Sequence, residues 1–236
     1  PSRPHWLKGN KGVELPVHCI FFDTETKSYA TEKDTEEARL WFGWACYVRR
    51  YRDQTWSKPT WCRFTSPGGF WRWLAKYCQP KRKLHIFAHN LGFDFTVIKG
   101  FKRTKRDGWK STGRIVDDPP TVLKFRKDGC TITFIDTLNY FRLSLKEVGN
   151  YVGHAKLDIP DLADSKAQWD AYCKADVEIL VATMESYWRM VYEWDLGNFA
   201  YTLPAQGFAA FRHRFMTTGV FIDDNEKASA LSRLGY

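Results

Sequence analysis

Several features that would place this chain in a familiar class are missing from its sequence. No two of its six cysteines form a Cys-x-x-Cys pair, and several lie inside apolar runs. This pattern predicts reduced, mostly buried thiols in a cytosolic setting and no zinc site. No apolar run approaches the roughly 20 residues that cross a bilayer, and no signal h-region opens the sequence. We therefore expect a soluble protein that is not secreted and has no membrane partner.

Internal repeats and low-complexity tracts are also missing, whereas positive charge and aromatic residues are abundant. The 36 Lys and Arg residues exceed the 27 Asp and Glu residues, which gives a formal net charge of +9, and 17% of residues are aromatic. A basic globular protein usually binds a polyanion, and nucleic acid is the first expectation. The alternative is a basic protein that is merely soluble. The length of 236 residues suffices for one sizeable core, or for a core and a small appendage.

The apolar pattern predicts an alternation of strands and helices. Strands are expected at 17–23, 40–51, 60–65, 84–88, 122–126 and 131–136, the last two joined by an Asp-Gly hairpin turn. Helices are expected at 67–77, from 95 to 101, and at 145–151, 165–191 and 204–216. The polar segment 26–39 is predicted to be a loop. The basic segment 102–110 is predicted to be either a solvated loop or a segment that contacts phosphate.

Asp23 and Glu25 stand at the end of the first predicted strand. Because side chains alternate along a strand, both carboxylates project from the same side, about 7 Å apart. Two carboxylates at this distance repel each other unless a cation lies between them. A divalent metal such as Mg²⁺ or Mn²⁺ would meet this need, since these ions prefer oxygen ligands. The alternative is a strand that runs into a polar turn.

Two further segments offer polar groups. Asn90-x-x-x-Asp94 follows the strand predicted at 84–88, and Tyr172 and Asp176 stand four residues apart in the longest predicted helix, on one face of it. Each also has an ordinary explanation. Asp94 could cap the next helix, Tyr172 could be a core residue, and Asp176 could be a surface charge.

Taken in order, Asp23-x-Glu25, Asn90-x-x-x-Asp94 and Tyr172-x-x-x-Asp176 resemble the three exonuclease motifs of the DEDD superfamily, tyrosine subclass. The resemblance implies an α/β RNase H-like fold, a mixed central β-sheet flanked by helices. It also implies metal-dependent removal of nucleotides from 3′ ends, with Tyr172 orienting the attacking water. Two divalent cations, Mg²⁺ or Mn²⁺, would be held by Asp23, Glu25, Asp94 and Asp176.

The residues around these motifs narrow the resemblance. Segments 88–94, 134–138 and 144–148 are similar to the exonuclease domain of family B, protein-primed DNA polymerases. In that family, matching residues contact the single-stranded 3′ end, which suggests Thr26, Asn90, Phe93, Thr137 and Leu138 here. A lysine between the second and third motifs assists catalysis in that family. Lys156 is its best match, although the tyrosine expected shortly after it is Asp161 in this chain.

The resemblance divides the chain into a basic leader (1–16), an exonuclease domain (17–200) and a helical segment (201–236). This last segment would lead toward a polymerase domain, possibly in the same longer chain, that is absent here. No palm-domain motif is present, so we expect no polymerase activity from this chain alone.

The expected activity is hydrolysis of single-stranded DNA 3′ ends to nucleoside 5′-monophosphates. It would serve as the proofreading domain of a polymerase or as a free-standing nuclease, in the cytoplasm or wherever the DNA is replicated. RNA as substrate, and a non-catalytic subunit that only binds nucleic acid, are the alternatives.

Overall fold

A seven-stranded mixed sheet forms the centre of the protein in the computed structural model, which describes residues 4–30, 36–117, 119–161 and 163–222. Across the sheet the strands are β4 (Thr60–Phe64), β3 (Glu36–Arg49), β2 (His18–Ala30), β5 (Lys83–Ala88), β8 (Cys130–Asp136), β7 (Thr121–Lys127) and β6 (Lys110–Val116). β5 runs parallel to β2 and to β8, and the other neighbouring pairs are antiparallel.

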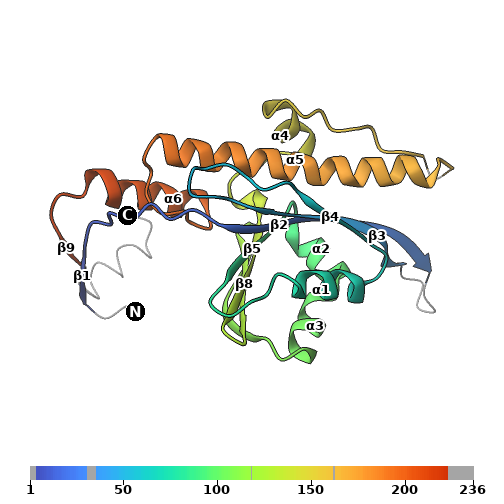
Figure 1. Ribbon diagram of the computed structural model, residues 1–236, viewed down its shortest axis with the longest axis horizontal. Coiled ribbons are helices and arrows are strands. Elements are labelled where there is room, and N and C mark those ends of the chain that lie inside the picture. The colour runs from blue at the N-terminus through green and yellow to red at the C-terminus, as the bar shows by residue number, and fades with distance from the viewer. Residues whose placement is uncertain (1–3, 31–35, 118, 162, 223–236) are drawn as a thin grey trace, which may run out of the picture.

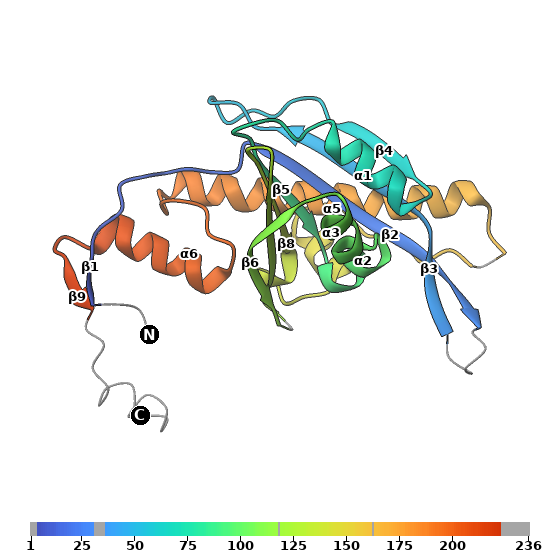
Figure 2. The ribbon, with the colours of Figure 1, turned by 90° about the horizontal axis from the view of Figure 1, so that it is seen from below.

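Helices cover both faces of this sheet (Figures 1 and 2). One face carries α1 (Pro67–Ala75), α2 (Leu91–Val97) and α3 (Gly100–Arg106), and the other carries α4 (Leu145–Tyr151) and the long α5 (Lys166–Glu193). A 3₁₀ turn (Thr137–Asn139) follows β8. The predicted α/β fold, a mixed sheet flanked by helices, is therefore confirmed.

The strand that carries the first motif is buried on both faces, as its continuous apolar run predicts. Phe22 packs with Phe70 of α1 on one face, and Phe21 packs with Trp188 of α5 on the other. Burying such a side chain contributes about 1.5–3 kcal/mol. This packing fixes the two faces of β2, so Asp23 and Glu25, in phase with Phe21, face α5.

The segment 26–39 was predicted to be a loop, and this prediction was wrong for most of its described residues. β2 continues to Ala30, β3 begins at Glu36, and the two pair as an antiparallel ribbon. Polar residues suit this ribbon because its side chains from Lys27 to Tyr29 and from Glu37 to Arg39 are exposed. The register shifts between Glu25 and Thr26, which is a β-bulge next to the first motif.

The segment after the second motif also differs from the prediction. The helix expected from 95 to 101 is two helices, α2 and α3, because Lys99 between them has φ 54°. Most of the basic segment 102–110 belongs to α3 and is not a loop. β6 was not predicted, since all seven of its residues are exposed and show no alternation of apolar and polar side chains. The predicted Asp-Gly hairpin turn between β7 and β8 is confirmed.

The two ends of the described chain meet. The helix expected at 204–216 is α6 (Leu203–Ala210) followed by a π-helical turn (Phe211–Phe215). Beyond it, β9 (Val220–Ile222) pairs with β1 (His5–Leu7), so part of the predicted leader is joined to the last segment. All six cysteines are free and four are buried, as predicted. Within the described residues, no helix is both long enough and apolar enough to span a membrane.

Candidate active site

The predicted carboxylates lie just beyond the point where the pairing of β2 with β5 ends, at Phe21 and Phe87. Asp23 and Glu25 come from β2, and Asp94 comes from α2, which begins just after β5. Asp176 comes from the middle of α5, which crosses the sheet on the other side (Figure 1). Each of these carboxylates takes part in a charge interaction with at least one of the others that raises a pKa. The structure thus brings together four acidic residues that the sequence holds in three separate segments.

Asp23 lies at the centre of this group. Burial raises its pKa well above the usual range, and the charges of Asp94, Asp176 and Glu25 raise it further. Burial, followed by the charge of Asp176, raises the pKa of Glu25 to about 7. These are the consequences of packing like charges together without a counter-ion. A divalent cation with a preference for oxygen ligands would remove the repulsion.

Cys173 is a member of the site that sequence reasoning missed. A ligand atom from each of Asp23, Glu25 and Cys173 lies within 4.8 Å of the others. The Cys173 thiol lies 3.5 Å from Asp23 Oδ2, and burial raises its pKa, so the thiol stays protonated and donates to the carboxylate. We therefore assign Cys173 to holding Asp23 in place. Its position next to Tyr172 in the third motif was the only signal in the sequence.

Asp94 is held from the opposite side of β2. Its carboxylate is almost fully buried, and the Thr24 hydroxyl donates a 2.5 Å hydrogen bond to Asp94 Oδ1. Burial raises the pKa of Asp94 to about 8, although the bond from Thr24 works in the other direction. Thr24 thus connects the strand of the first motif to the helix of the second.

Asp176 is the clearest indication that the site suits a metal. The Lys156 ammonium donates a hydrogen bond to Asp176 Oδ2, whereas Asp176 Oδ1 is buried and has no hydrogen-bond partner among the described residues. A buried carboxylate oxygen without a partner is costly, by about 1–3 kcal/mol or more. Because Asp176 also raises the pKa of Asp23 and Glu25, an oxygen-binding cation near these groups would satisfy the orphaned atom.

Lys156 and Tyr172 lie beside this carboxylate. The Lys156 ammonium is 4.8 Å from the centroid of the Tyr172 ring. Burial acts to lower the pKa of Lys156, but the hydrogen bond to Asp176 outweighs it, so the pKa is raised and the side chain stays charged. Burial raises the pKa of Tyr172, so its phenol stays protonated. The predicted lysine therefore lies beside both residues of the third motif.

Asp136 is a second residue whose role was not predicted from the sequence. Its carboxylate accepts hydrogen bonds from the backbone N–H groups of Asn90 (3.1 Å), Leu91 (2.8 Å) and Leu138 (2.9 Å). These bonds tie the end of β8 to the start of α2. Asp136 thus fixes the loop that carries the second motif.

The residues predicted to contact substrate differ in their exposure. Phe93 is 44% exposed, and Asn90 is exposed with φ 62° and makes no capping hydrogen bond with its side chain. Thr26 and Leu138 are half-buried. Thr137 is buried, and its hydroxyl bonds to Ala88 O (3.3 Å) and to His89 Nδ1 (2.9 Å). Asn90 and Phe93 are thus accessible to a ligand, whereas Thr137 is buried.

Comparisons with known proteins identify the fold. No protein-family model and no curated protein matches this chain. Phi29 DNA polymerase complexed with single-stranded DNA matches with a TM-score of 0.58 and 17% identity, over 86% of this chain and 36% of that one. The same polymerase with primer-template DNA and incoming nucleotides matches with a TM-score of 0.58 and 16% identity, over 86% and 35%.

The chain therefore spans about a third of the polymerase that it matches. At this low sequence identity, the structural similarity supports the fold alone. It is the RNase H-like α/β fold that the motifs implied.

Proposed function

We propose that this chain is a metal-dependent 3′→5′ exonuclease that hydrolyses single-stranded DNA ends to nucleoside 5′-monophosphates. The observation that carries the proposal is the meeting of four carboxylates from three segments, with one buried oxygen, Asp176 Oδ1, left without a partner. Such a set of oxygen donors suits two divalent cations, Mg²⁺ or Mn²⁺. The residues that would hold them are Asp23, Glu25, Asp94 and Asp176.

Two bound cations would supply an activated water and stabilise the attacking and leaving oxygens of an in-line displacement. The chain's own groups then position the reactants. Tyr172, protonated at neutral pH, would donate a hydrogen bond that orients the attacking water and would keep its proton. Lys156 holds Asp176 by its ion pair and places positive charge close to the site. Thr24 and Cys173 fix the orientation of Asp94 and Asp23.

The substrate end would bind over the loop that Asp136 holds. Phe93 and Leu138 would stack against the terminal bases, which is worth about 1–3 kcal/mol per base. Asn90 and Thr26 would contact the same strand, whereas the buried Thr137 would support the backbone at Ala88 through its hydrogen bond. Stacking and backbone contacts are indifferent to sequence, so we expect no base preference. Phi29 DNA polymerase has been solved with single-stranded DNA, which supports DNA as the polymer. We further propose a proofreading role, in a longer chain or beside a polymerase.

The test is a cleavage assay on a 5′-labelled single-stranded DNA. The wild-type chain should shorten it stepwise from the 3′ end with Mg²⁺ or Mn²⁺, and EDTA should stop the reaction. Asp23→Asn combined with Asp94→Asn should abolish shortening, whereas the exposed Asp158→Asn should not change it. Undiminished cleavage by the double variant would refute the proposal. A matched RNA strand, run in parallel, shows whether the enzyme prefers RNA.

A further inference from the structure

A second feature of the molecule is a stripe of positive charge on α3. Lys99, Lys102, Arg103 and Arg106 recur at helical spacing and therefore share one face of the helix. The opposite face of α3 is buried through Gly100 and Thr104. The helix is thus anchored on one side and presents four cations on the other. In Figure 1, α3 lies beyond α2 on the side away from α5.

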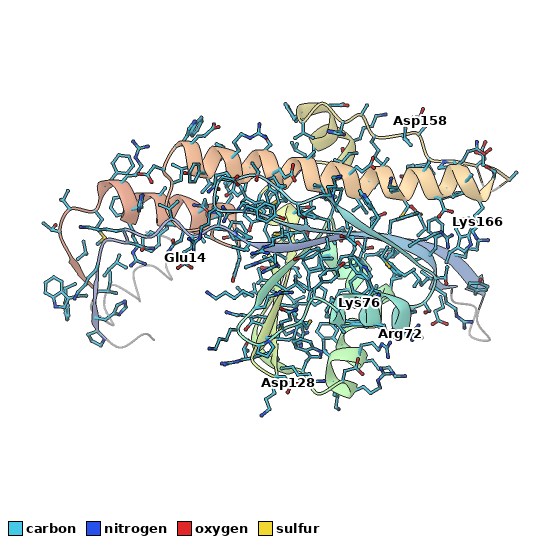
Figure 3. The ribbon with its side chains drawn as sticks, viewed as in Figure 1. Glu14, Arg72, Lys76, Asp128, Asp158 and Lys166 are labelled. Carbon is cyan, nitrogen blue, oxygen red and sulfur yellow. The ribbon has the colours of Figure 1, made fainter. Side chains whose placement is uncertain are left out.

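These cations converge on the start of α1. A hollow of about 390 Å³ is lined by the four side chains and by three residues at the beginning of α1, which are Ser66, Pro67 and Gly68. A Cβ atom added to Gly68 would lie 2.8 Å from the Arg103 guanidinium and 3.4 Å from that of Arg72. Gly68 therefore leaves room for two guanidinium groups to approach each other. Arg72 is labelled in Figure 3.

Few carboxylates neutralise the positive charges of this stripe. Within the described parts of the chain, Arg106 is the one member of the stripe with a carboxylate in ion-pair contact, Asp107 at 2.7 Å. Arg103 Nε is buried and has no hydrogen-bond partner. Two guanidinium groups brought together repel each other, and an anion between them turns the repulsion into attraction. The planar guanidinium donates paired hydrogen bonds that match a phosphate.

We propose that this surface, the basic face formed by Arg72, Lys99, Lys102, Arg103 and Arg106, binds backbone phosphates of the nucleic-acid strand whose 3′ end lies in the carboxylate site. The inference rests on the proposed function for the location of that end. α3 follows α2, the helix that carries Asp94, on the same face of the sheet, so a strand of more than a few nucleotides with its 3′ end in the carboxylate site can reach the basic face.

The experiment measures binding of fluorescent oligothymidylates by anisotropy, in EDTA so that the strand stays intact, between 50 and 200 mM salt. The test variant is Lys102→Gln combined with Arg106→Gln. Each lost phosphate contact on a single strand lowers the slope of log Kd against log salt by about 0.7. We therefore expect a 20-nucleotide strand to lose about 1.4 in slope, and a four-nucleotide strand to keep its wild-type slope.

The control variant is Lys58→Gln combined with Lys146→Gln, which removes the same charge from exposed residues outside the basic face. It should bind the longer strand with the wild-type slope. Equal slopes for the test and control variants would overturn the inference, and so would an equal loss on the four-nucleotide strand. Circular dichroism melting curves should show that both variants are folded.

A hydrolysis assay distinguishes a failure of this inference from a failure of the proposed exonuclease function. With Mg²⁺, the test variant should hydrolyse the four-nucleotide strand at the wild-type rate, because the strand ends before the basic face. If the wild-type chain hydrolyses neither strand, the proposed function fails, while the salt slopes still decide whether the basic face binds phosphate.

Discussion

Raising the pH from 6.5 to 8.5 without divalent cations should destabilise this protein, and Mg²⁺ or Mn²⁺ should reverse the loss. The prediction follows from Asp94, whose pKa burial raises to about 8. In the unfolded chain the same group has a pKa near 4 and is already ionised. The folded state therefore binds the extra proton, and the stability that this proton provides disappears as the pH rises through the folded pKa.

The size of the stability loss follows from the part of the pH range that lies between the unfolded and folded pKa values of Asp94. Between pH 6.5 and 8, each pH unit removes about 1.36 kcal/mol, so Asp94 alone accounts for a loss of about 2 kcal/mol. Glu25, with its pKa raised to about 7 mainly by burial, acts in the same direction. The window avoids His18 and His85, whose pKa values burial lowers to about 4. These two stabilise the fold above pH 6.5 and lose that effect only as the pH falls.

The assay is urea unfolding at pH 6.5, 7.5 and 8.5, in EDTA and in 10 mM Mg²⁺. Asp94→Asn is the matched control, because its amide can still accept the bond from Thr24 but does not titrate. Subtracting the variant's pH profile from that of the wild type cancels the titrating groups that do not interact with Asp94. A difference that is flat between pH 6.5 and 8.5 in EDTA would refute the reasoning, and so would a stabilisation by Mg²⁺ that does not grow with pH.

Three further predictions concern single residues. Phe93→Ala should raise KM for a single strand about 5- to 150-fold, the equivalent of about 1–3 kcal/mol of stacking, with little change in kcat; an unchanged KM would contradict the role of Phe93. Lys156→Met should lower the single-turnover rate about 10- to 100-fold, because Asp176 loses the partner that orients it, and Lys156→Arg should recover part of the rate; a wild-type rate in the Met variant would exclude that role. Trp188→Ala, at a side chain only 1% exposed, should cost about 3–5 kcal/mol in urea unfolding, and a loss below about 1 kcal/mol would show that the site collapses without a cavity.

The local sequence pattern was sufficient to predict those strands and helices whose burial follows directly from their apolar residues. The apolar run before Asp23 predicted a strand that is buried on both faces, and Phe21 and Phe22 are both fully buried. The spacing of Tyr172 and Asp176 predicted one helical face, and both are buried on α5. These features depend on residues that are close in sequence, so periodicity alone identifies them.

Features that depend on distant pairing were missed. Asp136 has its role because β8 ends beside the start of α2, and its partners Asn90 and Leu91 lie 46 and 45 residues away. The ribbon of β2 and β3 is stabilised by cross-strand hydrogen bonds, and its polar sequence carries no alternation that marks a strand. β6 escaped prediction for the same reason, since all of its residues are exposed.

The environment of Asp176 is compatible with a site that stays folded both without a cation and with the proposed one. Its two carboxylate oxygens have different environments: Oδ2 accepts from Lys156, and Oδ1 is buried without a hydrogen-bond partner. The lysine therefore offsets part of the repulsion among the carboxylates and leaves one oxygen available. A cation and Lys156 can then bind Asp176 together, since they need different atoms. If the cation and Lys156 instead competed for one oxygen, Lys156→Met would tighten Mg²⁺ binding. If they share the carboxylate, Mg²⁺ should bind the Lys156→Met variant with the same or weaker affinity. Isothermal titration calorimetry can measure this difference directly.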